Sequence, residues 1–231
     1  MIIFNGIDLA SVANVKVEDI NVGPIQESPI VSERAIRAGA EFVRGHKGTR
    51  RVVITFQVKE ENQVVRSADI MNITAWAQSE KPGKLELPNQ PDKYLMAYCT
   101  ELPDPSLRQW WQILRLTFTC FDPYWISKGE KSVACGTDFV VMGDAPPMMK
   151  ITRTITGSAV SDQSYGLNGN TITFSTIPVG DMVIDLESQT AVSGSTDIMQ
   201  YYNVNSKFLV PKVGSQKVTG TGTVKWRERW A

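Results

Sequence analysis

The stretch at residues 110–125 constrains the fold more than any other, because it combines a strand pattern with a stop signal. Its two faces alternate, one with Trp110, Gln112, Leu114, Leu116, Phe118 and Cys120, the other with Trp111, Ile113, Arg115, Thr117 and Thr119. This period of two predicts a half-buried β-strand. Pro123 lacks an N–H and biases Asp122 toward extended backbone, so we expect the strand to end there. Residues 126–129 then predict a linker, which divides the chain into domains 1–127 and 128–231.

The N-terminal half predicts several strands, one helix and an extended arm. Alternation indicates strands at residues 2–4, 12–22, 52–58, 85–87 and 94–101. The second strand slips in phase near Asp19, which favours a β-bulge, and Gly23-Pro24 is expected to end it. Residues 68–79 predict the helix, capped by Ser67 and ended by Pro82-Gly83. Residues 30–43, rich in Ala and Gly, are typical of an extended arm or hairpin.

The C-terminal half predicts a β-sandwich or jelly roll. Short strands recur at intervals of roughly 8–12 residues, with Gly, Asn and Pro between them, and no helical pattern of useful length appears. Asn168-Gly169 predicts a hairpin turn, because both residues tolerate positive φ. The expected fold class is therefore mainly β, in two domains.

Charge, hydropathy and cysteine content exclude several classes of function. The 24 basic and 24 acidic residues cancel, so no global field attracts nucleic acid or a membrane surface. No run of about 18 apolar residues predicts a membrane span, and the N-terminus has no signal-peptide pattern. Cys99, Cys120 and Cys135 are an odd number without metal-type spacing. They are expected to be free thiols, in a protein made in a reducing compartment.

His46 is the only histidine, which removes most catalytic triads and zinc sites. It lies in a basic cluster of Arg44, His46, Lys47, Arg50 and Arg51. Two interpretations stay open: a solvated hairpin tip, or a docking surface for an acidic partner or a neighbouring subunit. Residues 45–49 are glycine-flanked but lack the spacing of a phosphate-binding loop.

Two further groups of residues are candidates for chemical sites. The carboxylates Asp181, Asp185, Glu187 and Asp197 fit a polar sheet face, although a paired-carboxylate hydrolase or a calcium site would also use such residues. The aromatics Tyr201, Tyr202, Trp226 and Trp230 could stack on sugars, or pack and close a sandwich edge. Adjacent residues in a strand point to opposite faces, so Tyr201 and Tyr202 would not form one platform. We expect no catalytic, cofactor or metal site.

Several segments resemble the distal tail protein (Dit) family of siphophages. Members of this family come mostly from phages and prophages of Gram-positive bacteria. The Phe-Asp-Pro-Tyr-Trp-Ile motif at residues 121–126 carries the resemblance, with support from residues 2–8, 143–147 and 182–192. The family's Pro-Gly-Asn turn near the last strands is replaced by the sequence of residues 211–215. The resemblance covers nearly the whole chain.

The resemblance implies both a fold and a role. The N-terminal half would be a β-sandwich-type ring domain with one helix and a β-hairpin arm, assembled as a hexamer. The C-terminal half would be a galectin-like β-sandwich. The ring would join the tail tube protein to a tail-associated lysin or fibre protein, and would anchor receptor-binding proteins. The protein would be a non-enzymatic virion component at the tail tip, made in the host cytoplasm. The alternative is a lectin-like carbohydrate-binding module.

Two sets of residues follow as site candidates. Ile36, Phe42 and Arg44 are predicted at the oligomer interface, because the mixed pattern of residues 30–43 does not suit a strand with one buried face. Phe121, Tyr124 and Trp125 are predicted to pack between the domains or under the first sheet.

Overall fold

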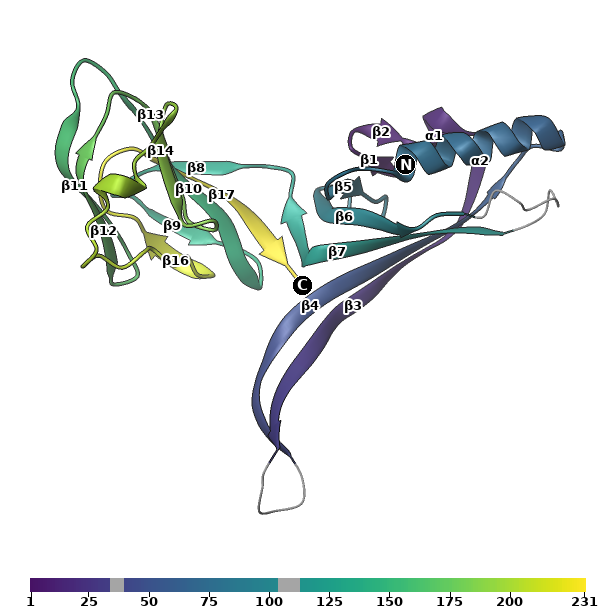
Figure 1. Cartoon of the computed structure of the whole chain (residues 1–231), viewed down its shortest axis with the longest axis horizontal. Coiled ribbons are helices and arrows are strands. Elements are labelled where there is room, and N and C mark those ends of the chain that lie inside the picture. The colour runs from purple at the N-terminus through teal and green to yellow at the C-terminus, as the bar shows by residue number, and fades with distance from the viewer. Residues whose placement is uncertain (34–39, 104–112) are drawn as a thin grey trace. The chain divides into compact units, whose positions relative to one another are not determined.

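The computed structural model describes the backbone of residues 1–33, 40–103 and 113–231, and the side chains of these residues outside 28–46. The chain divides into two compact units, unit 1 (Met1–Trp125) and unit 2 (Ile126–Ala231). Both units are mainly β, as the sequence predicts (Figure 1).

Unit 1 is built on an antiparallel sheet with the strand order β2-β1-β5-β6-β7-β4-β3. Its elements are β1 (Ile3–Phe4), β2 (Ile7–Asp8), α1 (Leu9–Val12), β3 (Val15–Glu33), β4 (Ala40–Val58), α2 (Gln63–Ala77), β5 (Gly83–Glu86), β6 (Lys93–Glu101) and β7 (Leu114–Ser127). Strands β1 and β2 form a tight hairpin, in which Asn5 and Gly6 adopt φ values of 51° and 84°. Both values lie in the left-handed region, which Asn and Gly tolerate best.

The core of unit 1 lies between this sheet and α2. Ile70, Ile73 and Trp76 recur at helical spacing and are buried. The Trp76 ring lies 5.8 Å from the ring of Phe4 and 6.3 Å from that of Phe118, in edge-on geometry. Its indole N–H donates to the carbonyl of Ile7 at 2.9 Å, so the buried polar atom is satisfied.

The helix begins five residues earlier than predicted. Asn62, not Ser67, is the N-cap: its side-chain oxygen accepts from the amides of Val64 at 2.9 Å and Val65 at 3.4 Å. The Ser67 hydroxyl instead donates to the carbonyl of Gln63 within the helix. The prediction failed because β-branched Val64 and Val65 have low intrinsic helix propensity, which the cap and the packed helix override.

Strand β7 does not end at Pro123 as predicted, but continues to Ser127. The predicted inward face is correct, since Leu114, Leu116 and Phe118 are buried. Pairing of β7 with β4 stops at Cys120, opposite Arg50. Pro123 lies beyond that pair, so its missing N–H removes no ladder bond to β4.

Strand β3 carries the predicted bulge, because its register with β4 shifts between Val17 and Asp19. Contrary to prediction, Gly23-Pro24 does not end the strand. The register shifts again between Val22 and Ile25, and pairing then resumes. A proline within such an irregularity does not need to donate to the ladder.

Unit 2 contains a larger antiparallel sheet with the order β15-β14-β13-β10-β17-β8 and two ribbons, β11–β12 and β16–β9. Its elements are β8 (Lys131–Ala134), β9 (Asp138–Val141), β10 (Ala145–Ile155), β11 (Val160–Leu167), β12 (Asn170–Ile177), β13 (Gly180–Asp185), β14 (Thr190–Ser193), β15 (Thr196–Asp197), the 3₁₀ turn η1 (Met199–Tyr201), β16 (Gly214–Lys217) and β17 (Thr223–Trp230). A bridge between Gly166 and Thr219 links β11 to the chain just after β16.

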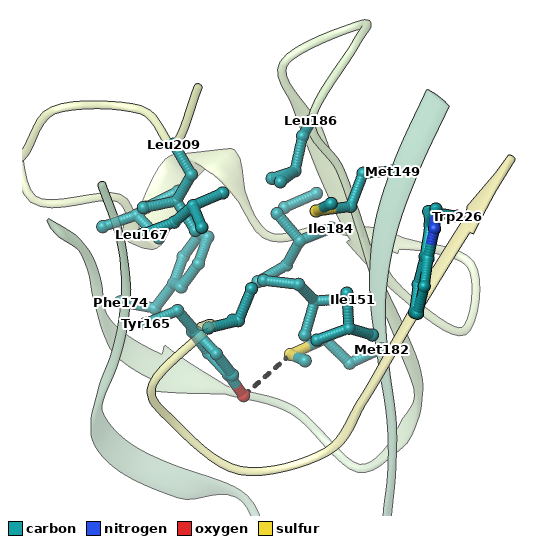
Figure 2. Packing of buried hydrophobic residues seen from close by; sticks show 14 of the residues in the cluster. Met149, Ile151, Tyr165, Leu167, Phe174, Met182, Ile184, Leu186, Leu209 and Trp226 are labelled. Carbon is teal, nitrogen blue, oxygen red and sulfur yellow. Dashed lines mark hydrogen bonds between the residues drawn. The ribbon is translucent and has the colours of Figure 1, made fainter. Parts of the chain in front are cut away.

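The core of unit 2 lies between these layers (Figure 2). Ile151, Tyr165 and Phe174 are among its fully buried side chains, and the Tyr165 hydroxyl donates to the Met182 sulfur at 3.6 Å. The predicted turn at Asn168-Gly169 is confirmed, with φ values of 51° and 80° and the flanking residues Leu167 and Asn170 paired.

Candidate assembly surfaces

The longest feature of unit 1 is a two-stranded hairpin formed by β3 and β4. The register places Glu33 opposite Ala40 and Val15 opposite Val58. Strand β4 pairs with β7 only from Arg50 to Phe56. We call residues 27–33 and 40–47 the hairpin arm. Within the described part of the chain, these residues pair only with one another. An isolated two-stranded ribbon is marginally stable in water at best, so this geometry favours a partner for the arm.

Two of the three predicted interface residues fall on this arm. Phe42 lies opposite Val31 and Arg44 opposite Ile30 in the backbone ladder, so both belong to β4. Ile36 lies outside the described residues, as do the side chains of Phe42 and Arg44. Their role at an interface remains a prediction.

The basic cluster is not a loop, contrary to the predicted hairpin tip. Residues 44–51 continue β4 along its pairing with β3. The Lys47 ammonium lies 5.2 Å from the centre of the Tyr124 ring, a cation–π contact. Arg50 is only 5% exposed. Among the side chains that the structure describes, Lys47 and Arg50 therefore have different surroundings.

Arg51 belongs to a polar network on the outer face of the sheet. Its guanidinium donates to Glu101, whose other carboxylate oxygen accepts from the Thr117 hydroxyl at 2.7 Å. These bonds, the one from Thr117 first and the one from Arg51 second, lower the pKa of Glu101 below its usual value. The network links β4, β6 and β7 and keeps this face polar.

The aromatic residues predicted at the domain junction have unequal exposure. Phe121 is 61% exposed, Tyr124 is half-buried and Trp125 is 7% exposed. Burial of Trp125 agrees with packing, whereas the Phe121 side chain is open to solvent. Packing of these residues between domains remains a prediction.

The four carboxylates of unit 2 serve local structure. Asp185 accepts from the amides of Glu187 and Ser188 and lies 3.4 Å from the Lys150 ammonium. Burial alone would raise the pKa of Asp185, but these hydrogen bonds and Lys150 together lower it. Glu187 does not share the strand face with Asp185, because β13 ends at Asp185; it forms an ion pair with Arg229.

The other two carboxylates also have local partners. Asp181 accepts from the Thr154 hydroxyl at 2.7 Å, and Asp197 accepts from the amide of Met199 at the start of η1. Across the described residues, no group of three or more His, Cys, Asp or Glu side chains could hold a metal ion.

Three of the four candidate sugar-stacking aromatics are used in packing, and the fourth, Trp230, is half-buried. Trp226 is 5% exposed, and its ring lies 4.6 Å from the Phe139 ring. Tyr201, the last residue of η1, and Tyr202, which follows it, both pack against the unit 2 core. The Tyr202 hydroxyl donates to the carbonyl of Ser206 at 2.7 Å.

A polar groove of about 480 Å³ lies on the outer face of the larger sheet of unit 2. Thr152, Thr154, Asp181 and Lys225 contribute to its lining, and none of its lining residues is aromatic. It therefore offers hydrogen-bonding groups but no ring on which a sugar could stack.

The three cysteines are free thiols in the structure, as predicted. Burial raises the pKa of Cys99 to about 11 and that of Cys120 to about 12. Burial also raises the pKa of Cys135. Thiols with such pKa values are poor nucleophiles at neutral pH.

No helix in the described ranges has the length and hydropathy needed to cross a bilayer.

Sequence reasoning missed one surface, the outer face of α2. Val64 and Met71 project there and are 78% and 67% exposed. The signal was present, because apolar residues recur at helical spacing from Val64 onward. It was overlooked because the helix was expected to begin only at residue 68.

Comparison with known proteins shows which solved structures have a similar fold. No protein-family model matches the sequence, and neither does any curated protein. Among solved structures, the chain is similar to the Dit protein (gp 19.1) of phage SPP1, described as a paradigm of hub adsorption apparatus in phages that infect Gram-positive bacteria. The TM-score is 0.80 at 14% identity, over 100% of this chain and 98% of that chain.

Two structures of the phage p2 baseplate in its activated conformation, with Sr and with Ca, are similar at a TM-score of 0.50. They share 10% and 11% identity and cover 94% of this chain and 91% of theirs. The chain therefore has, along its whole length, the fold of the SPP1 Dit protein.

Proposed function

We propose that this protein is a structural component of a siphophage tail tip. Its copies form a hexameric ring between the tail tube protein and a tail-associated lysin or fibre protein. The observation that carries this proposal is the similarity of fold to a phage hub protein over the whole chain, at a TM-score of 0.80. The motif at residues 121–126 and the hairpin arm support the same role.

The arm gives the ring a physical basis. A closed ring needs heterologous contacts, in which two different surfaces of each copy meet. The arm pairs only with itself in the part of the chain that the structure describes, and a ribbon of this kind gains stability when a neighbour covers it. The arm of one copy therefore contacts unit 1 of the next copy.

Unit 2 serves as the attachment site for a receptor-binding protein. Its carboxylates cap turns and form ion pairs, which supports a non-enzymatic role for the protein. The protein acts in the virion, at the tail tip, after synthesis in the host cytoplasm. The free thiols are compatible with a reducing site of synthesis.

The mass of the assembly in solution tests this proposal. Native mass spectrometry over a range of protein concentrations should detect a species of six copies, and negative-stain images should show rings. The same measurement in the presence of the tail tube protein covers the case in which the ring needs a template. A protein that stays monomeric under both conditions would refute the ring.

A further inference from the structure

Helix α2 has a second apolar stripe on the side away from the sheet. Val64, Ala68, Met71 and Ala75 follow one another at spacings of four, three and four residues, so they lie on one face. All four are exposed. The buried positions Arg66, Ile70, Ile73 and Ala77 have the same spacing but lie on the opposite face. We call Val64, Ala68, Met71 and Ala75 the outer stripe.

The composition of this outer face is unusual for a helix in contact with water. The charged residues of α2 are Arg66, which is buried, and Asp69, which is half-buried, so neither lies on the outer face. A solvent-facing helix surface normally carries charged and polar side chains, and a helix that is apolar all round is normally covered. Val65, 44% exposed, extends the uncharged surface.

The outer stripe continues into a surface cavity of about 300 Å³. Its lining comes from α2 and the chain after β6: Met71, Thr74, Ala75, Gln78, Leu102 and Pro103. Leu102 is 39% exposed and adds a further apolar side chain. Met71 thus stands at the centre of a continuous uncharged surface.

A second, different apolar surface lies elsewhere on unit 1. A cavity of about 130 Å³ is lined by side chains from the N-terminus, α1 and β3, among them Leu9, Val15, Val17 and Ile20. The bulge after Val17 explains how Val15, Val17 and Ile20 come to line one cavity. Met1 and Val17, which also line it, are exposed. We call this surface the N-terminal pocket.

We propose that the outer stripe of α2 in one copy docks in the N-terminal pocket of the next copy, with Met71 as the inserted side chain. The two surfaces match in chemistry, because both are mainly apolar. The charged groups at the pocket are the N-terminal ammonium of Met1 and the carboxylate of Asp8, which already accepts from the amide of Ala10. An apolar cavity of about 150 Å³ can hold a benzene molecule, so this pocket has room for one aliphatic side chain.

The partner is a second copy because the chain itself supplies both complementary surfaces. Since the two surfaces differ, their contact is heterologous and repeats from copy to copy, as a ring requires. The inference rests on the proposed ring and adds an interface separate from the hairpin arm.

Charge placed at the centre of the stripe tests the contact. Met71→Glu should raise the protein concentration at half-assembly by roughly tenfold or more, because assembly would bury an unpaired carboxylate. The matched control is Asn72→Glu: the neighbouring residue is exposed but does not line the cavity beside the stripe. Val17→Glu, at the pocket, should weaken assembly as Met71→Glu does.

Cross-linking tests which surfaces meet. Met71→Cys and Val17→Cys proteins, mixed and treated with a short bis-maleimide, should give covalent dimers. Either protein alone should give only the background of wild-type protein, since the native thiols are at least partly buried. Dimers from Met71→Cys alone would indicate two stripes face to face and would overturn the proposal.

The outcomes separate this inference from the ring itself. If wild-type protein forms rings and Met71→Glu forms them at the same concentration, the stripe proposal is wrong and the ring stands. If wild-type protein never associates, both are wrong. If Met71→Glu lowers the melting temperature of dilute monomer by more than Asn72→Glu does, the stripe is covered within its own chain and the proposal is also overturned.

Discussion

Phe121 and Trp125 lie four residues apart on β7, yet the first is 61% exposed and the second 7%. The residue pattern alone could not separate them, because strand periodicity places both on the same face. Turn chemistry was more informative at this scale: Asn168-Gly169 specified its hairpin correctly, since few other residues accept positive φ at both positions.

The pair provides a matched test of burial. Trp125→Ala should destabilise unit 1 by about 3 kcal/mol or more, the usual cost of removing a buried Trp. In a domain of this size that corresponds to a fall in melting temperature of roughly 10 °C. Phe121→Ala should change the melting temperature little. Scanning calorimetry of both variants measures these shifts, and equal shifts would contradict the burial of Trp125.

The lowered pKa of Asp185 leads to a second prediction at the scale of the residue. Its pKa in the folded protein is lowered from the ordinary value of 3.8, so the native state favours the ionised form. The resulting stability is fully present above that ordinary value and is lost as pH falls through the lower, native value. Asp185→Asn should therefore be less stable than wild type at pH 7, and the difference should vanish in acid.

Urea unfolding of unit 2 at several pH values measures this difference. Lys150→Gln is the companion variant, because it removes the ion-pair partner and leaves the turn amides of Glu187 and Ser188 in place. A difference between wild type and Asp185→Asn that stays constant from neutral to strongly acidic pH would show that the charge of Asp185 contributes nothing.

At the scale of elements, the sequence predicted which segments form strands better than where they end. A strand was predicted from residue 110 onward, and β7 is described from Leu114; this strand and the bulge in β3 were predicted correctly from alternation. The predicted strand ends at Pro123 and at Gly23-Pro24 were wrong, because a proline disrupts a strand only where a ladder partner needs an N–H at that position. Neighbouring strands determine that need, and a single sequence does not reveal them.

The hairpin arm yields the prediction at this scale. Ile36→Asp with Phe42→Asp should give protein that keeps the fold of both units but does not assemble, because charges would be introduced where a neighbouring copy covers the arm. Analytical ultracentrifugation measures assembly, and circular dichroism monitors the fold. The control is Glu61→Asp, a conservative change of an exposed residue outside the arm. Normal assembly of the double variant would exclude the arm from the interface.

At the scale of the whole molecule, the mainly β fold followed from residue patterns, whereas the family resemblance came from a short aromatic motif. The compact units, 1–125 and 126–231, meet at the end of that motif. Assembly surfaces were harder to predict. A stripe such as that of α2 becomes visible only when the structure shows which apolar residues the core does not use.

We also predict that the purified protein does not bind host cell-wall polysaccharide at micromolar concentration, and that adsorption needs a separate receptor-binding protein. Trp226 is buried against Phe139, and the polar groove of unit 2 has no aromatic residue in its lining. Co-sedimentation with cell walls tests this. Saturable binding that Trp226→Ala abolishes without unfolding the protein would instead support the lectin-like alternative.

The chain enters and leaves unit 2 at the same place. Strand β17 pairs with β8, and Arg227 and Glu228 bond to Ser127: the Arg227 guanidinium donates to its carbonyl, and the Glu228 amide donates to its hydroxyl oxygen, both at 3.1 Å. The Lys131 ammonium lies 2.7 Å from the Glu228 carboxylate. A force that pulls Ser127 away from β17 would therefore load these bonds together with the ladder between β17 and β8, so the first and last strands of unit 2 resist it as one.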